Sequence, residues 1–326
     1  MPVDAAIAPL PRRRWRRWLR RAGIAAVLVV LAAVAVHLRV VPFVWYWGMM
    51  QLNASDWRDR AIWLPDYRVA LDAAPVAGVA SNLSGLTYSA ETGTLFSVVN
   101  RPPLAVELSP DGRLLRTLPI RGAGDPEGIT HVAGDRFIVV DEDSQTFTWV
   151  RIGPDTAEIV LDGAPRFSLH MDKRDNMGFE GVSWDDRTGR LLIVQEMLPL
   201  RVLVVEGLAG LVAGGPMALD IWEWAPSDAS RLFMRDLSSI TLHEPTGHVL
   251  LLSHMSSMVV EYAADGTPVS ILPLVRGAAG LSATVPQAEG IAMGPAGEIF
   301  VVSEPNLFYR LERTHPAPWM GAGQGG

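Results

Sequence analysis

A long apolar stretch near the beginning of the chain is the first clear pattern. Residues 22–36 contain no charged side chain, and only His37 and Arg39 interrupt the apolar character before residue 50. A helix needs about 20 such residues to cross a bilayer. We therefore predict a transmembrane anchor over residues 22–41, in which the long side chain of Arg39 reaches the far interface.

The residues on either side of this stretch predict its orientation. Seven arginines between Arg12 and Arg21 form a basic cytoplasmic head at residues 1–21, because positive charge stays on the cytoplasmic side. Phe43, Trp45, Tyr46 and Trp47 then form an aromatic belt at the outer interface. The prediction is a single-pass protein of the inner membrane, with the remainder of the chain outside the cytoplasm. A cleaved signal peptide is the alternative, with Ala33-Val34-Ala35 as its small-residue cleavage site.

Beyond residue 65, apolar and polar positions repeat in five similar units. The units cover residues 84–100, 127–142, 180–196, 238–254 and 289–304. A central glycine divides each unit into two strands joined by a tight turn, at Gly93, Gly134, Gly189, Gly247 and Gly297. The second strand is a continuous apolar run, such as Leu191-Leu-Ile-Val194, which predicts burial on both faces.

The period of these units predicts the fold class. The unit starts lie 43 to 58 residues apart, and further strand-like runs follow each unit. Three or four strands at that period are typical of a β-propeller, so the chain is all-β apart from its anchor. Five blades are favoured, and six stay open if residues 207–235 contain an irregular blade instead of a long excursion with a short helix. The run from Tyr67 to Val79 is predicted to pair into the last blade and close the ring.

These patterns give the domain organisation. An interfacial segment and linker over residues 42–65 joins the anchor to the propeller at residues 66–313, and a flexible tail covers residues 314–326.

Two repeat positions are polar in every unit and are expected around the central channel. The first position holds Ser84, Glu127, Glu180, Ser238 and Glu289, and the last holds Asn100, Glu142, Glu196, His254 and Glu304. Converging carboxylates repel each other, and either raised pKa values or a bound cation relieves the repulsion. Glu127, Glu180 and Glu289 are therefore candidate ligands for Ca²⁺ or another divalent cation, and the other seven are candidate channel-lining residues. The competing interpretation is that each glutamate caps backbone amides at a blade entry.

Composition excludes several classes of function. The first 40 residues carry about +7 and the remaining 286 about −14, so the acidic body is a poor nucleic-acid binder. The absence of cysteine excludes disulfides and thiolate chemistry. The sequence contains no nucleophile elbow, phosphate loop or HExxH motif, and His254 is a candidate base.

Several strings in the chain resemble those of a known family. The strings around Ser84, Glu180, His254 and Glu289, and above all Val302-Ser-Glu-Pro-Asn-Leu-Phe-Tyr-Arg310, are similar to the SdiA-regulated (YjiK-like) family of membrane-anchored β-propellers. The resemblance implies a propeller and an N-terminal anchor in a bacterial envelope protein, and implies little about chemistry. A looser similarity connects the Glu-Gly blade starts with regucalcin and gluconolactonase propellers, which hold a divalent cation on the axis. Ser84 and Ser238 depart from that pattern, which argues against lactonase activity.

Three functional hypotheses follow from the sequence. The first is a membrane-tethered binding module for a periplasmic ligand or protein, with a calcium-like ion at its channel. The second is a metal-dependent hydrolase of lactones or phosphoesters, with His254 or a glutamate as base. The third is a purely structural envelope scaffold.

Overall fold

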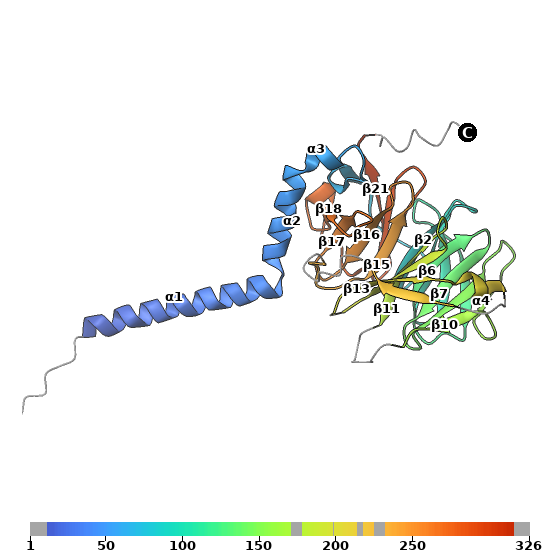
Figure 1. The fold of residues 1–326 in the computed structure, drawn as a ribbon, viewed down its shortest axis with the longest axis horizontal. Helices are drawn as coiled ribbons and strands as arrows, with labels where there is room; N and C mark the ends of the chain where they lie inside the picture. Colours follow the sequence, from blue (N-terminus) through green and yellow to red (C-terminus); the bar gives the residue numbers. More distant parts are fainter. Residues whose placement is uncertain (1–11, 171–177, 198, 214–217, 225–231, 316–326) are drawn as a thin grey trace, which may run out of the picture.

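The computed structural model describes residues 12–170, 178–197, 199–213, 218–224 and 232–315. Over these residues the chain forms a five-bladed β-propeller preceded by helices (Figure 1). Neighbouring strands within each blade are antiparallel, as expected for strands joined by short turns. The five-blade prediction is confirmed.

The blades follow one another along the chain, and each begins with its innermost strand. Blade 1 contains β2 (Leu83–Ser89), β3 (Thr94–Val99), β4 (Leu104–Leu108) and β5 (Leu114–Arg121), with β9 (Ile159–Val160) parallel to β5. Blade 2 contains β6 (Pro126–Ala133), β7 (Arg136–Asp141), β8 (Thr146–Arg151) and β10 (Arg166–Ser168). Blade 3 contains β11 (Phe179–Asp185), β12 (Arg190–Gln195), β13 (Arg201–Glu206) and β14 (Asp220–Glu223).

The last two blades complete the ring. Blade 4 contains β15 (Ser239–His243), β16 (His248–Ser253), β17 (Met258–Tyr262) and β18 (Pro268–Pro273). Blade 5 contains β19 (Ala288–Met293), β20 (Ile299–Ser303), β21 (Leu307–Arg313) and, as its outer strand, β1 (Tyr67–Pro75). Tyr67 pairs with Arg313 and Pro75 with Leu307, so the predicted closure by the N-terminal strand is correct. Short 3₁₀ turns occur at Leu64–Asp66 and Ala278–Gly280.

Residues 207–235 add no sixth blade in the part of this region that the structure describes. They contribute the short helix α4 (Ala209–Ala213) and the outer strand β14 of blade 3.

Apolar side chains fill the spaces between neighbouring blades. Five separate clusters each combine residues from two adjacent blades. The second strands supply both sides of this packing: Leu191 and Ile193 face the blade 2 side, whereas Leu192 and Val194 face the blade 4 side. The continuous apolar runs therefore arise because every second strand is buried on both faces.

The innermost strands approach one another at backbone distance around the axis. A Cβ atom on Gly128 would lie 2.4 Å from the carbonyl oxygen of Glu180 in the next blade, and one on Gly85 would lie 2.7 Å from the carbonyl oxygen of Glu127. Gly181 and Gly290 are equally close to Ser239 and Gly85. In blades 1, 2, 3 and 5 the glycine after the first repeat position is therefore needed for inter-blade packing, whereas blade 4 has Ser239 there, whose hydroxyl accepts from the Ile291 N–H.

Hydroxyl groups then link the inner strands laterally. The backbone N–H groups of His131, Trp184 and Leu242 donate to Thr87, Thr130 and Ser183 of the preceding blade, each at 3.0 Å. These hydroxyls lie two residues after the close-packed glycines, which explains why Thr or Ser recurs there.

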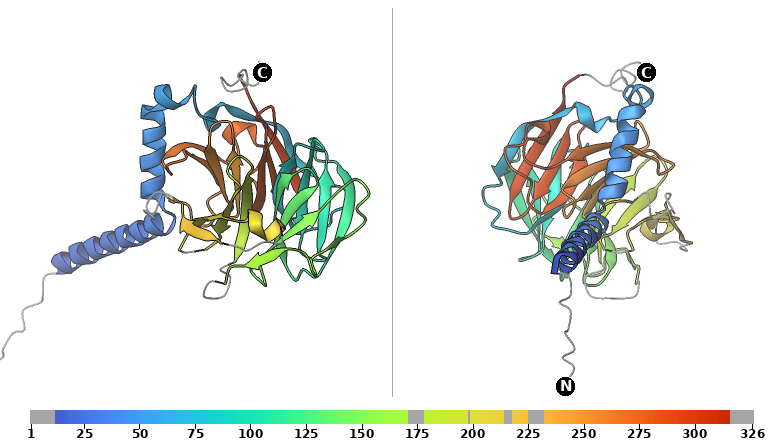
Figure 2. Two further views of the ribbon diagram at one scale, coloured as in Figure 1. Left: turned by 45° about the vertical axis from the view of Figure 1, so that its right-hand side comes forward. Right: turned by 90° about the vertical axis from the view of Figure 1, so that its left-hand side faces the viewer.

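Two long helices precede the propeller, and the second one packs against it. Helix α1 (Arg12–His37) projects away from the blades, and α2 (Val40–Leu52) runs along blade 4 (Figure 2). The candidate membrane span is Trp15–His37, with a mean hydropathy of 2.1 and no buried portion. Such a helix is typical of membrane anchoring or secretion.

The helix breaks between α1 and α2, inside the stretch predicted as one anchor over residues 22–41. Arg39 adopts a left-handed conformation with φ 52°. Pro42 explains the break, because proline cannot donate to the carbonyl of Leu38 four residues earlier and its ring clashes with that group.

One side of α2 packs on the propeller. Tyr46 stacks on Phe233 with ring centroids 4.8 Å apart, and Phe43 packs against the same cluster. Trp45 and Trp47 of the predicted aromatic belt stay exposed, at 64% and 37%. Only part of that belt is therefore free to meet an interface.

The segment predicted as linker is also fixed. After α3 (Ala54–Trp57), the backbone N–H groups of Ile62 and Trp63 donate to the fully buried carboxylate of Glu261, at 2.7 and 3.0 Å. In the predicted tail, Thr314 N–H donates to the Asp66 carbonyl at 2.9 Å, and residues 316–326 lie outside the described part.

The close approach at Gly128 generates a stability prediction. Gly128→Ala should lower the free energy of unfolding by about 3 kcal/mol, because the new methyl group collides with backbone. For a domain of this size, the melting temperature of the detergent-solubilised protein should fall by roughly 6–12 °C.

Gly153→Ala is the matched control for this substitution. Its Cβ would meet only the hydroxyl of Thr156 at 4.0 Å, so the melting temperature should barely change. Equal melting temperatures for both variants would contradict the packing argument.

Candidate cation site at the channel mouth

The two polar repeat positions meet at one mouth of the channel. The first position lies near the start of each inner strand, and the last follows each second strand, so hydrogen-bonded pairing places both at the same end. Glu180 of blade 3 is close enough to Glu196, Glu289, Glu127 and Glu142 for their charges to interact. The predicted convergence of carboxylates from several blades is therefore present.

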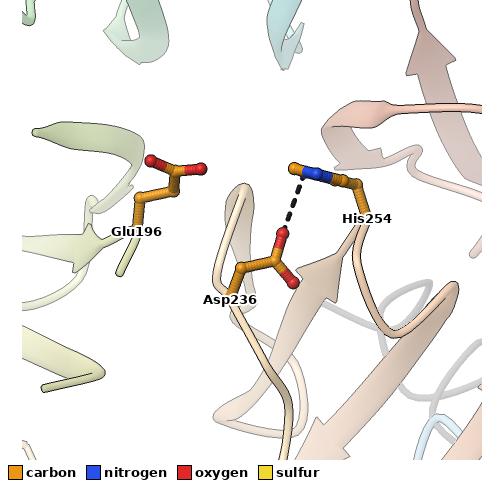
Figure 3. Close-up of side chains that lie close together, drawn as sticks. All are labelled: Glu196, Asp236 and His254. Carbon is orange, nitrogen blue, oxygen red and sulfur yellow. Dashed lines mark ion pairs between the residues drawn. The ribbon is translucent and has the colours of Figure 1, made fainter. Parts of the chain in front are cut away.

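One group at this mouth combines Glu196, Asp236 and His254 (Figure 3). Glu196 directly follows β12, His254 directly follows β16, and Asp236 precedes β15. One ligand atom from each residue lies within 4.8 Å of the other two. His254 Nδ1 lies 2.8 Å from Asp236 Oδ2 and 3.6 Å from Glu289 Oε1.

Asp236 is held as a carboxylate at the bottom of this group. It is completely buried, and burial alone would raise its pKa. Contacts with His254 and Ser253, and the Met255 N–H at 3.1 Å, outweigh burial and hold the pKa below its ordinary value. Contact with Asp236 conversely raises the pKa of His254 against the effect of its own burial. The two shifts favour the ion-paired form, with Asp236 as a carboxylate and His254 protonated.

A second group contains Asp125, Glu127 and Glu142, also with ligand atoms within 4.8 Å of one another. Asn100 donates to Glu127 Oε1 at 2.6 Å, and Asn82 donates to Asn100 at 2.7 Å. Oδ1 of Asp125 is buried without a hydrogen-bond partner. These carboxylates supply oxygen atoms only, so the group differs chemically from the one that contains His254.

Unlike Asp236, four glutamates at this mouth have raised pKa values. Burial, together with neighbouring carboxylates, raises the pKa of Glu127 to about 7 and that of Glu289 to about 8, against the opposing contacts with Asn100 and His254 respectively. Part of Glu180 is open to the channel, yet protein surrounds it, so lost hydration and then Glu196 raise its pKa well above the usual value. Burial and then Asp236 raise the pKa of Glu196. The mouth therefore takes up protons or a cation to relieve its negative charge.

Three of the predicted channel-lining residues, Ser84, Ser238 and Glu304, lie outside the two groups of ligand atoms. Ser84 and Ser238 are buried between blades, where they donate to the carbonyls of Glu127 at 3.1 Å and Ala288 at 2.7 Å. They join neighbouring blades at the level of the mouth. Glu304 is half-buried at the start of the turn after β20, near enough to Glu289 to raise the pKa of that residue.

Asp125 and Asp236 belong to the site although the repeat analysis missed them. Both lie two residues before the first repeat position, where Asn82 and Gln287 are also polar. In blade 3 this position is Gly178, and a Cβ there would lie 2.0 Å from Glu142 Oε1. The polar residue at this position in four of the five blades was the signal in the sequence. The fifth blade has Gly178, which leaves space for the Glu142 carboxylate.

A cavity of 500 Å³ lies at the opposite mouth of the channel. Its lining includes Thr87, Thr130, His131, Trp184 and His243. Burial lowers the pKa of His243 to about 4, so this histidine is neutral at physiological pH. This mouth is thus distinct from the acidic one in shape and in charge.

The raised pKa of Glu289 generates a pH prediction. Its folded pKa of about 8 exceeds the ordinary value of 4.5, so the folded state retains a proton that the unfolded state releases. Stability in EDTA should fall as pH rises from about 5 to about 8, with an upper limit on the order of 5 kcal/mol. Glu289→Gln should flatten this part of the curve of melting temperature against pH.

Glu312→Gln provides the control, because Glu312 is half exposed on blade 5. This variant should keep the slope of the parent. A parent protein whose melting temperature rises over this pH range would overturn the argument.

Several solved structures are similar to this chain. Similar backbones occur in regucalcin, a calcium-binding protein from Agrobacterium tumefaciens, at 12% identity, covering 77% of this chain and 95% of that chain, with a TM-score of 0.47. A gluconolactonase from Xanthomonas campestris is similar at 15% identity, covering 70% and 71%, with a TM-score of 0.43. A luciferin-regenerating enzyme is similar at 12% identity, covering 75% and 94%, with a TM-score of 0.47.

These similarities concern the fold alone. The family model described as SdiA-regulated matches residues 59–312, which contain every blade of the propeller. The chain therefore belongs to the SdiA-regulated family.

Proposed function

We propose that this protein is a membrane-anchored, extracytoplasmic binding module whose acidic channel mouth holds a divalent cation of the calcium type. The observation that carries the proposal is the presence of two groups of ligand atoms at one mouth, each within 4.8 Å, one from blade 2 and one from blades 3 and 4. The bound ion would order the mouth and present it to a periplasmic ligand or partner protein.

The chemistry of the two groups supports different ions. Asp125, Glu127 and Glu142 offer only hard oxygen atoms, which suit Ca²⁺, Mg²⁺ or Mn²⁺. The group with His254 adds an imidazole nitrogen, which suits transition metals better. Glu180 and Glu289 interact with both groups and are therefore ligands that either ion can recruit. We assign the calcium-type ion to the group that contains Glu127.

The composition of helix α1 supports the proposed extracytoplasmic location of the propeller. Its apolar surface is fully exposed and long enough to span a bilayer, and the arginines at its N-terminal end favour the cytoplasmic side. The propeller would then lie outside the cytoplasm, with its cation site open to the periplasm.

Calcium titration of the detergent-solubilised full chain, after treatment with EDTA, tests the cation site. Glu127→Gln should weaken Ca²⁺ binding at least tenfold in isothermal titration calorimetry, because the site loses a charged oxygen ligand. Asp236→Asn should leave Ca²⁺ binding closer to that of the parent, since it belongs to the other group.

Glu91→Gln is the control, because this exposed glutamate lines the cavity at the opposite mouth. It should bind Ca²⁺ like the parent. A parent with no calorimetric signal and no change in melting temperature on adding Ca²⁺ would refute the cation site.

Membrane attachment has its own test. The protein should stay in the membrane pellet after alkaline carbonate extraction, and its mass should include residues 1–36. A chain that begins shortly after Ala35 and appears in the soluble periplasmic fraction would show that the helix is a cleaved signal peptide.

The Asp236–His254 pair favours one second candidate, a metal-dependent hydrolase. His254 contacts a buried carboxylate and keeps 25% of its side chain exposed, which is an arrangement suited to a general base. Lactone, ester and phosphoester substrates tested with and without metal would reveal such an activity. Turnover equal to that of a His254→Asn variant would exclude it.

A further inference from the structure

A cavity of 390 Å³ lies at the elbow between α1 and α2, where the helices meet blade 4. Its apolar wall includes Leu38, Val40, Phe43, Phe233, Met258 and Val275. The wall thus combines the end of the candidate membrane span with the propeller. This volume lies within the usual range of small-molecule sites.

Two arginines complete the lining of this cavity. Arg39 Nη1 donates to the Leu232 carbonyl and Arg235 Nη1 to the Met255 carbonyl, both at 3.4 Å. Neither guanidinium pairs with a carboxylate among the described residues, and no acidic residue lines the cavity. Arg235 Nη2 also lies 3.4 Å from His37 Nε2. In a chain with an acidic body, this is a local concentration of uncompensated positive charge.

The position of the cavity relative to the span identifies what would occupy it. A 23-residue helical span covers about 34 Å, slightly more than the hydrocarbon core of a bilayer. Its C-terminal end at His37 therefore lies at headgroup depth, beside the cavity. The free side of α2 is apolar as well, with Val41, Val44 and Trp45 each at least 60% exposed. This exposed apolar surface would contact the bilayer beside the end of the span.

We infer that the elbow cavity is a binding site for an anionic phospholipid of the surrounding bilayer. Arg39 and Arg235 bind the phosphate, and the apolar wall between α2 and blade 4 holds the adjoining acyl segment. This inference rests on the proposed membrane anchor, because α1 must remain attached for the cavity to lie at the interface.

Native mass spectrometry of the full chain tests the site, with release from detergent micelles that contain equal amounts of phosphatidylglycerol and phosphatidylcholine. The parent should retain phosphatidylglycerol in preference to phosphatidylcholine. The double variant Arg39→Gln/Arg235→Gln should lose about tenfold or more of that preference, because two cations near an anionic headgroup are removed.

Arg113→Gln/Arg166→Gln removes the same charge from exposed positions on blades 1 and 2 and should keep the preference of the parent. Val275→Trp fills the cavity from a residue that is 41% exposed, so the fold should tolerate it. This variant should retain less of both lipids, and it keeps the test decisive if the arginine variant fails to fold.

The same mass spectra distinguish a failure of the lipid site from a failure of the membrane anchor. An intact parent that retains neither lipid, or an arginine variant that retains phosphatidylglycerol like the parent, would overturn the lipid site and leave the anchor standing. A parent mass that lacks about 35 N-terminal residues would refute the anchor and the lipid site together.

Discussion

The close approach of the five inner strands around the channel axis is the constraint on which the rest of the structure depends. Gly85, Gly128, Gly181 and Gly290 permit this approach, since a Cβ at any of them would lie within 2.7 Å of an atom in the neighbouring blade. The residue immediately before each of these glycines is then drawn to the mouth. Convergence of Glu127, Glu180 and Glu289 is thus a geometric consequence of how tightly the ring closes.

That convergence sets the electrostatics of the mouth. Burial and mutual repulsion favour protonated glutamates, whereas Asp236 stays ionised because it is hydrogen-bonded and paired with His254. A divalent cation would replace the protons on the other carboxylates, which couples ion binding to pH. The fold sustains this unfavourable cluster because closure by β1, the inter-blade apolar clusters and the buried Glu261 contacts stabilise the ring elsewhere.

The repeat made the blades predictable, since every unit has a turn glycine followed by an apolar run in the same register. It also pointed to Glu127, Glu180 and Glu289, whose side chains are close enough for their charges to interact. The repeat analysis missed Asp125 and Asp236 because each repeat unit was taken to begin two residues later. Both aspartates lie in the loops before the inner strands β6 and β15. Ser84 and Ser238 each donate to a carbonyl of the next blade, and the Ser84 hydroxyl also contacts the carboxylate of Glu127. The break at Arg39 was also present in the sequence, because Pro42 cannot complete the hydrogen bond of a continuous helix.

The two sites are connected by the chain itself. Arg235 at the elbow cavity is adjacent to Asp236 at the mouth, and Met255 at the cavity is adjacent to His254. Two cross-links hold these loops together: the Met255 N–H donates to Asp236, and the Arg235 N–H donates to Ser256 at 3.0 Å. A phosphate that draws the Arg235 side chain toward the bilayer would therefore act on the same two loops that position Asp236 and His254. Because these hydrogen bonds join the two loops, the elbow cavity and the channel mouth share one structural element.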